Sequence, residues 1–137
     1  MQAKLIKKYE GLKLKAYKCP AGVWTIGWGT TYYPNGKKVQ PGDTCTKQQA
    51  EEYLEHYINN KIKMPDGLNA SQQEAVASLI YNIGQGGFDR SRLKKAIIAK
   101  DYQKIIQNWD WVTANGVQLK GLAKRRAEEL FYFLKDI

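Results

Sequence analysis

The sequence predicts a mostly helical α+β fold with a small β-hairpin lobe near the N-terminus. Residues 23–29 are rich in β-branched and aromatic side chains, and their hydrophobic period is that of an extended strand. From residue 47 onward, apolar residues return to helical spacing, and patterns typical of helix N-termini precede several segments. With 137 residues the chain has the length of one domain. We expect a single domain, 1–137, made of a β-rich lobe over 12–46, a bridging helix over 47–63, and a helical lobe over 64–137 with the 1–11 helix.

The first helix is predicted to end at Glu10, because Gly11 follows and glycine readily adopts the left-handed conformation that terminates helices. A carboxylate at a helix C-terminus meets the negative end of the helix dipole, and burial would further disfavour its charge. Both effects favour a protonated Glu10, and an acid that keeps its proton can donate it. An isolated glutamate at a helix end is, however, more often only a surface acid.

A turn at 20–22 and the run 23–29 predict a small hairpin directly after Cys19. One face of the extended run would carry the large side chains Trp24, Ile26 and Trp28. Thr25 lies on the opposite face among small residues, where a ligand could approach the backbone closely. The plainer interpretations are a small buried hydrophobe for Cys19 and an ordinary strand residue for Thr25.

Residues 32–43 carry a Pro-Asn-Gly turn signal and a Pro-Gly pair, which predict a second hairpin arm and a loop. Thr46 and Gln49 form a capping-box pattern, and the apolar stripe after them predicts a helix from about Lys47 to Lys61. The lone His56 lies off that stripe, so we interpret it as solvated or structural rather than as a catalytic base.

The second half is predicted to be helical throughout. Residues 64–67 break the preceding helix, and Ser71 with Glu74 forms a capping-box pattern before an almost wholly apolar helix that ends at Gly84. The predicted elements after it are a glycine-rich loop over 85–90, helices capped by Ser91 and Asp101, a turn at 115–116, and a last helix from about Leu122 to Lys135 that buries Leu122, Leu130, Phe133 and Leu134. The cluster Trp109-Asp110-Trp111 fits a core better than a sugar-stacking surface, although both remain open.

Two motifs carry a family resemblance. Glu10, Cys19 and Thr25 are separated by eight and five residues within EG-x4-AY and TIGWGTT, and GLAKRRAEELF spans 121–131. This arrangement resembles the phage-type lysozymes, or endolysins, of glycoside hydrolase family 24, including the T-even phage lysozyme family. The resemblance implies a lysozyme-like fold and assigns the three residues to a catalytic triad. Most familiar members carry Asp at the middle position, so Cys19 is a departure.

The resemblance also implies further site residues. It suggests substrate-binding roles for Gly29, Thr31 and Asn82, although a buried Asn82 bonding to loop backbone fits equally well on chemistry alone. It suggests that Arg125 or Arg126 forms a salt bridge with Glu10, which would lower the pKa of that glutamate against the effect of the dipole. The alternative for the two arginines is a solvated helix face with partners such as Glu128 and Glu129.

The activity implied is hydrolysis of the β-1,4 bond between N-acetylmuramic acid and N-acetylglucosamine in peptidoglycan. Glu10 would protonate the leaving oxygen, and Thr25 would orient water. Cys19 would act as base or nucleophile if it is a thiolate, and would only position water if it is a thiol. The resemblance favours inversion through water, and the cysteine keeps a covalent route open. No cofactor or metal is expected, and the two cysteines, Cys19 and Cys45, fit no zinc-finger pattern.

The formal charge of +9 favours an anionic partner such as a cell-wall polymer, and no recognisable motif predicts nucleic-acid binding. We weigh two alternatives, a lytic transglycosylase and a non-catalytic basic module that binds cell wall or nucleic acid. No apolar run long enough to span a membrane and no signal-peptide core occur, so we expect synthesis in the bacterial host cytoplasm, no membrane insertion, and action on the wall. We further expect a monomer that relies on a separate membrane-permeabilising protein, as in the systems it resembles.

Overall fold

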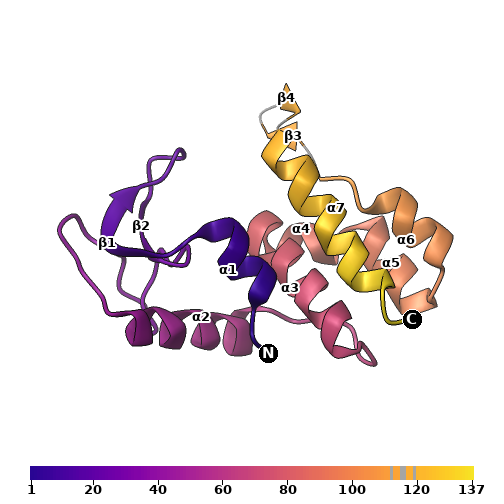
Figure 1. Cartoon of the computed structure of the whole chain (residues 1–137), viewed down its shortest axis with the longest axis horizontal. Helices are drawn as coiled ribbons and strands as arrows, with labels where there is room; N and C mark the ends of the chain where they lie inside the picture. The colour runs from indigo at the N-terminus through magenta and orange to yellow at the C-terminus, as the bar shows by residue number, and fades with distance from the viewer. Residues whose placement is uncertain (112, 115–116, 119) are drawn as a thin grey trace. The chain divides into compact units, whose positions relative to one another are not determined.

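The computed structural model describes residues 1–111, 113–114, 117–118 and 120–137, and it confirms a mostly helical α+β fold (Figure 1). The turn predicted at 115–116 lies outside the described residues. Contacts divide the chain into two compact units. Residues 6–62 form one, called the hairpin unit here, and residues 1–5 with 63–137 form the other, called the helical unit. The predicted grouping of the whole chain into one domain stays a prediction.

A short antiparallel hairpin organises the hairpin unit. Its elements are the end of α1 (Lys4–Glu10), β1 (Lys13–Lys18), β2 (Trp24–Gly27) and α2 (Lys47–Lys61). As predicted, α1 stops at Gly11, which has a φ of +71° and donates its N–H to the Lys7 carbonyl at 3.1 Å. In the hairpin, Tyr17 of β1 lies opposite Thr25 of β2, so their side chains share one face.

The extended run is shorter than predicted. Strand β2 ends at Gly27, because Gly27 and Gly29 have φ values of +66° and +88°, and Ile26 then pairs with Thr30 across a tight turn. A methyl group on Gly27 would lie 3.2 Å from the Cβ of Ala50 in α2. This part of the small-residue face is therefore occupied by a helix rather than open to a ligand, which corrects the sequence-based interpretation.

Helix α2 has the predicted bounds and the predicted capping box, in which Thr46 accepts from the Gln49 N–H and the Gln49 side chain accepts from Thr46. The loop before it contains the predicted turn, closed by a hydrogen bond from the Gly36 N–H to the Tyr33 carbonyl at 2.8 Å. Its second arm forms isolated bridges, Tyr32 with Lys38 and Lys15 with Thr44, in place of a regular strand.

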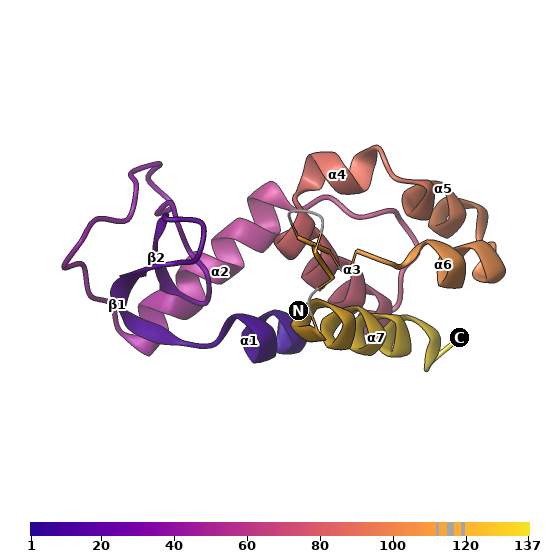
Figure 2. The same cartoon turned by 90° about the horizontal axis from the view of Figure 1, so that it is seen from above.

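The helical unit is built around α3. Its elements are α3 (Ala70–Ile83), α4 (Gln85–Asp89), α5 (Arg92–Ala99), α6 (Tyr102–Asn108), β3 (Thr113–Ala114), β4 (Val117–Gln118) and α7 (Lys120–Leu134). Helix α3 is buried over most of its surface and packs most extensively against α7, which runs beside it (Figure 2). Gly84 ends α3 as predicted, with its N–H bonded to the Ile80 carbonyl. None of the described helices has the length and apolar character needed to cross a lipid bilayer.

The predicted cap of α3 is wrong by two residues. The capping box is formed by Asn69 and Gln72, whose side chains accept from each other's backbone N–H groups. Asparagine is as good an N-cap as serine, and a glutamine three residues on completes the box. Glu74, which the sequence assigned to the cap, is instead buried and accepts the Lys4 backbone N–H at 2.8 Å.

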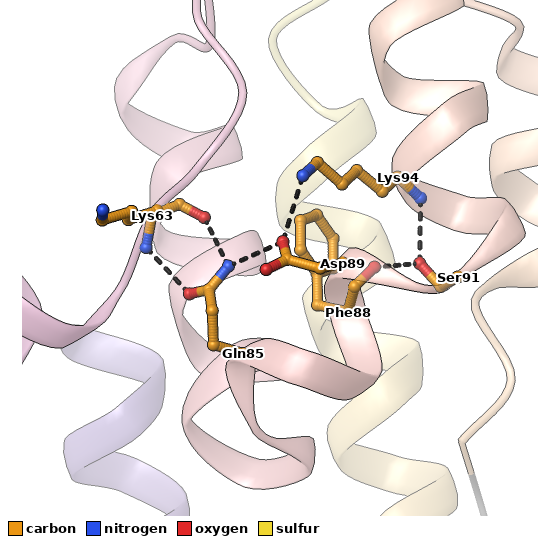
Figure 3. A network of polar contacts seen from close by, with 6 residues as sticks. All are labelled: Lys63, Gln85, Phe88, Asp89, Ser91 and Lys94. Carbon is orange, nitrogen blue, oxygen red and sulfur yellow. Dashed lines mark hydrogen bonds and ion pairs between the residues drawn. The ribbon is translucent and has the colours of Figure 1, made fainter.

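The predicted glycine-rich loop at 85–90 is also wrong, because this segment contains helix α4. Figure 3 shows the contacts that hold it. The Gln85 amide bonds both the N–H and the carbonyl of Lys63, at 2.8 and 2.9 Å, and also donates to Asp89. Asp89 in turn accepts from the Lys94 ammonium at 3.0 Å, while Phe88 is fully buried. These tertiary contacts outweigh the poor helix propensity of two glycines.

The predicted caps of α5 and α6 are confirmed, since Ser91 and Asp101 accept the Lys94 and Lys104 N–H groups. Both helices bury only a narrow apolar face, because Ile98, Tyr102 and Ile106 are exposed. Trp109 is buried and packs against Phe133, which confirms a core role. Of the four residues that the last helix was predicted to bury, only Phe133 is buried, and Leu122, Leu130 and Leu134 are half-buried.

Candidate active site

Cys19 lies at the start of the tight turn that joins β1 to β2. Its N–H donates to the Val23 carbonyl at 3.0 Å, and its carbonyl accepts the Gly22 N–H at 2.8 Å. Gly22 has a φ of +80°, a conformation that glycine adopts without penalty. The turn holds the half-buried thiol among backbone amides. Hydrogen bonding to the Val23 backbone, aided by the Ala21 backbone and the Thr25 side chain, lowers the pKa of Cys19 despite the opposing effect of burial.

Thr25 lies beside this thiol and is 4% exposed. Its hydroxyl donates to the Val23 carbonyl at 3.0 Å and also contributes to lowering the Cys19 pKa. A threonine hydroxyl has one proton, so it donates either to that carbonyl or to the sulfur, not to both at once. The pair is therefore arranged so that the Thr25 proton can turn toward the sulfur when the thiolate forms.

Glu10 is connected to the same cluster through Tyr17. Burial raises the pKa of the Tyr17 phenol, and the negative charges of Glu10 and Cys19 raise it further. Both acidic groups thus lie within electrostatic range of one phenol ring, which itself faces Thr25 across the hairpin. The half-buried Glu10 is the last residue of α1, and β1 begins three residues later. This short connection keeps Glu10 close to the start of the hairpin.

The other predicted contact residues are distributed over both units. Gly29 and Thr31 follow β2 in the hairpin unit, both half-buried. Asn82 lies near the end of α3 in the helical unit and is exposed, so the alternative of a buried Asn82 is wrong. Arg125 and Arg126 lie in α7 of the helical unit.

The two arginines belong to a buried polar network. Both pair with Glu129, which is fully buried, and the Arg126 Nε lies 2.7 Å from the Glu129 Oε1. Ser78 of α3 donates to Glu129 and accepts from the Arg125 Nε at 3.2 Å, and the Trp109 indole N–H donates to Glu129 at 3.2 Å. The intrahelical pairing with Glu129 is present, but the alternative of a solvated helix face is wrong, because Arg125 and Arg126 are buried. The salt bridge with Glu10 stays a prediction.

Sequence reasoning missed two features of these clusters. Tyr17 was visible only as part of a matching motif, and its position opposite Thr25 depends on strand register. Ser78 carried no sequence signal, and its meeting with Trp109 and Glu129 was not predicted, because the three residues come together only after α3 and α7 pack. Cys19 and Cys45 are both free thiols, and the buried Cys45 has a pKa raised by desolvation.

Comparison with known proteins gives consistent matches over nearly the whole chain. The phage lysozyme family model matches residues 7–129. An endolysin of Acyrthosiphon pisum secondary endosymbiont phage 1 is 40% identical over 141 residues, covering 94% of this chain and 92% of that protein. Among solved structures, an endolysin from Escherichia coli O157:H7 phage FAHEc1 has a TM-score of 0.81 at 33% identity, covering 99% and 92% of the two chains. A P22 lysozyme mutant has a TM-score of 0.74 at 33% identity, covering 97% and 94%.

Proposed function

Because the chain belongs to the phage lysozyme family, we propose that Glu10, Cys19 and Thr25 form the catalytic centre of this peptidoglycan hydrolase. The chain is an endolysin with muramidase activity, and its substrate is the glycan of the bacterial wall. The observation that carries the residue assignment is that Cys19 and Thr25 lie together on one hairpin, whose Tyr17 is within electrostatic range of both Cys19 and Glu10. We place the chain in glycoside hydrolase family 24, in the branch with Cys at the middle position.

In the proposed reaction, the Glu10 carboxyl donates its proton to the glycosidic oxygen as the bond from that oxygen to the N-acetylmuramic acid C1 breaks. A water molecule forms the new bond to C1 from the opposite face. Its proton passes to the Cys19 sulfur, and the Thr25 hydroxyl orients the water. This is the general acid and base arrangement of an inverting glycosidase.

The lowered pKa of Cys19 supports the role of base, because it increases the thiolate fraction at a given pH. The hydrogen bonds at the turn stabilise the anion, and a thiolate is the form that accepts the proton of water. Direct attack of the sulfur on C1 is the second route, and it would leave a covalent glycosyl-enzyme that water must then hydrolyse. The anomeric configuration of the first product, followed by NMR, separates inversion from this route.

Gly29, Thr31 and Asn82 are proposed as substrate contacts, and Arg125 or Arg126 as the partner of Glu10. Gly29 has a positive φ and, as a glycine, no side chain to obstruct a sugar that approaches the turn after β2. Asn82 is exposed and offers an amide that can donate to and accept from a sugar. Substitution of Thr31 or Asn82 by Ala is expected to raise KM more than it lowers kcat.

The decisive test is Glu10→Gln. The amide has the same size but no transferable acidic proton, so lysis of purified cell walls should fall by at least about a hundredfold, the usual contribution of one general acid. Glu55→Gln on the solvent side of α2 is the matched control and should retain activity. Retained activity in Glu10→Gln, with an unchanged circular dichroism spectrum, would end the assignment.

The role of the thiol is tested separately. Cys19→Ser removes the easily ionised group but keeps a hydrogen-bonding side chain, so we expect a large loss of activity. Full activity in Cys19→Ser would show that the sulfur takes no chemical part in the reaction. Alkylation of Cys19, confirmed by mass spectrometry of the labelled peptide, should also inactivate the enzyme.

Product analysis separates the alternatives. A hydrolase releases glycan fragments with reducing ends, a lytic transglycosylase releases anhydro-sugars, and a non-catalytic wall-binding module releases neither. We expect reducing N-acetylmuramic acid ends in the mass spectrum of digested peptidoglycan.

Monomeric action and reliance on a separate membrane-permeabilising protein are proposed with this function. The checks are sedimentation in solution and lysis by co-expression with and without such a protein.

A further inference from the structure

The hairpin unit carries a second polar hollow apart from the three proposed catalytic residues. It has a volume of about 470 Å³ and is lined by Tyr33, Pro34, Asn35, Asp43, Thr44 and Tyr53. The two tyrosine rings meet edge to face with their centroids 5.2 Å apart. Tyr53 comes from α2, while the other five residues come from the loop before it. The hollow is thus built by two elements of one compact unit.

Asp43 is oriented within this hollow. The Tyr33 hydroxyl donates to its Oδ2 at 2.7 Å, and the Gln40 N–H donates to the same oxygen at 2.9 Å. The hydrogen bond from Tyr33 is the largest cause of a lowered Asp43 pKa, so the carboxylate is ionised at neutral pH. These contacts explain the position of Oδ2 as part of the loop structure. They leave Oδ1 as a fixed hydrogen-bond acceptor.

Several polar groups around the hollow are not used by the fold. Within the described part of the chain, no residue hydrogen-bonds the Asp43 Oδ1 or the side-chain hydroxyls of Thr44 and Tyr53. Asn35 uses its Oδ1 to accept the Lys37 N–H, which leaves its amide N–H groups as donors. The hollow therefore offers one anionic acceptor, two hydroxyls and one amide donor beside two aromatic rings.

We propose that this hollow is an accessory saccharide-binding site, which holds a sugar of the glycan strand outside the catalytic centre. Each sugar hydroxyl can both donate and accept a hydrogen bond. Sugar hydroxyls can therefore pair with the carboxylate oxygen, the two protein hydroxyls and the amide of this hollow. The rings of Tyr33 and Tyr53 supply an apolar surface for the C–H faces of a sugar. A phosphate or nucleic-acid backbone is disfavoured by the negative charge of Asp43. One carboxylate alone is too few ligands for a divalent metal.

Strand β1 connects the hollow to the proposed catalytic turn. Residues 43–45 run along the free edge of β1, where Ala16 donates to the Asp43 carbonyl at 2.8 Å and Cys45 donates to the Leu14 carbonyl at 2.9 Å. From Lys15, which pairs with Thr44, to Cys19 the chain advances four residues, or roughly 13 Å of extended strand. One glycan strand could therefore be held at both places. This identification of the bound polymer rests on the proposed function.

The test measures binding without hydrolysis. In the Glu10→Gln background, an N-acetylglucosamine hexasaccharide is titrated and followed by amide chemical shifts and calorimetry. Shifts are expected at residues 33–35, 43–44 and 53, and Asp43→Asn should weaken binding about tenfold or more, since it removes a charge-assisted hydrogen bond. Thr44→Val leaves every hydrogen bond of Asp43 intact and should weaken binding less. The control Tyr57→Phe, on the same helix but outside the hollow, should bind normally.

Two results would overturn the proposal. One is shifts confined to the surroundings of Glu10, Cys19 and Thr25, with equal affinity in Asp43→Asn. The other is stronger binding of a lysine-containing stem tripeptide at the hollow, which would make it a site for an ammonium group instead of a sugar. In active enzyme, Asp43→Asn should raise KM for peptidoglycan with kcat unchanged, whereas a loss of kcat alone would reject the role. Failure of the catalytic assignment would appear as activity in Glu10→Gln, so the two failures are distinguishable.

Discussion

The two polar clusters of this chain differ in what surrounds their charges. Cys19 and Glu10 are half-buried, and the hydrogen bonds around Cys19 come largely from backbone groups of its own turn. Glu129 is fully buried, and its contacts come from side chains of α3 and α7 and from Trp109. The first cluster keeps its acidic groups half-buried near one turn, while the second joins several elements around one fully buried carboxylate.

This difference in burial suits the first cluster to catalysis and the second to stabilising the fold. A catalytic acid and base must reach substrate and exchange protons, so they are poorly suited to hold the fold together. A buried glutamate between two arginines has little contact with water. Removing its charge leaves two buried cations without their anionic partner. We therefore expect substitutions in the first cluster to change rates and substitutions in the second to change stability.

The largest effect is expected for Glu129→Gln. The amide keeps the shape but not the charge, so Arg125 and Arg126 lose a buried anion, and the unfolding free energy should fall by about 3–5 kcal/mol. Urea denaturation followed by circular dichroism measures this. Glu55→Gln, an exposed glutamate of α2, should change stability by less than about 0.5 kcal/mol. A similar small loss in both variants would contradict the proposed division.

A smaller effect is expected where backbone packing positions the hairpin. Gly27→Ala places a methyl group 3.2 Å from the Ala50 Cβ, whereas Gly22→Ala meets no atom within 4 Å. Both glycines have positive φ, so their conformational penalties are similar and the difference reports packing alone. Gly27→Ala should be about 1–3 kcal/mol less stable than Gly22→Ala, the usual effect of overpacking. Equal melting temperatures would mean that α2 shifts freely away from β2.

The structure around the proposed catalytic residues was largely predictable from the sequence. The end of α1 at Gly11, the turn before β2 and the bounds of α2 all depend on residues within a few positions of each other. Glycine conformation, capping and periodicity are local properties, so a single sequence carries them. The end of β2 at Gly27 was missed because glycine is also compatible with an extended strand, and the positive φ of Gly27 accompanies a close fit against Ala50 of α2, over twenty residues away.

The buried cluster could not be predicted in the same way. The sequence shows Arg125, Arg126 and Glu129 at helical spacing, which is equally consistent with a solvated face. Ser78 and Trp109, which lie 51 and 20 residues from Glu129, decide its burial. Helix α4 was missed for a similar reason, because Gln85 is fixed by the backbone of Lys63, 22 residues away. Pairings over such separations need packing information that periodicity does not contain.

The two cysteines test the first cluster without a substitution. Hydrogen bonds at the turn lower the Cys19 pKa, while burial raises the Cys45 pKa. A lowered pKa means that the thiolate persists as the pH falls, so alkylation of Cys19 should begin at lower pH and proceed faster than alkylation of Cys45. Mass spectrometry of iodoacetamide-labelled peptides between pH 6 and pH 9 gives both rates. Faster labelling of Cys45 would show that the turn does not stabilise the sulfur anion.

The smallest effect is expected at the exposed ion pair between Lys94 and Asp89, which compares a solvated pair with the buried one at a similar distance. Their atoms lie 3.0 Å apart, close to the 2.7 Å between Arg126 and Glu129, but the side chains are 33% and 45% exposed. Water and salt screen such a pair, so a double-mutant cycle with Lys94→Ala and Asp89→Ala should give a coupling of about 0.2–1 kcal/mol. Raising the salt concentration should reduce it further. A coupling as large as the loss in Glu129→Gln would show that distance, rather than burial, sets the strength of these pairs.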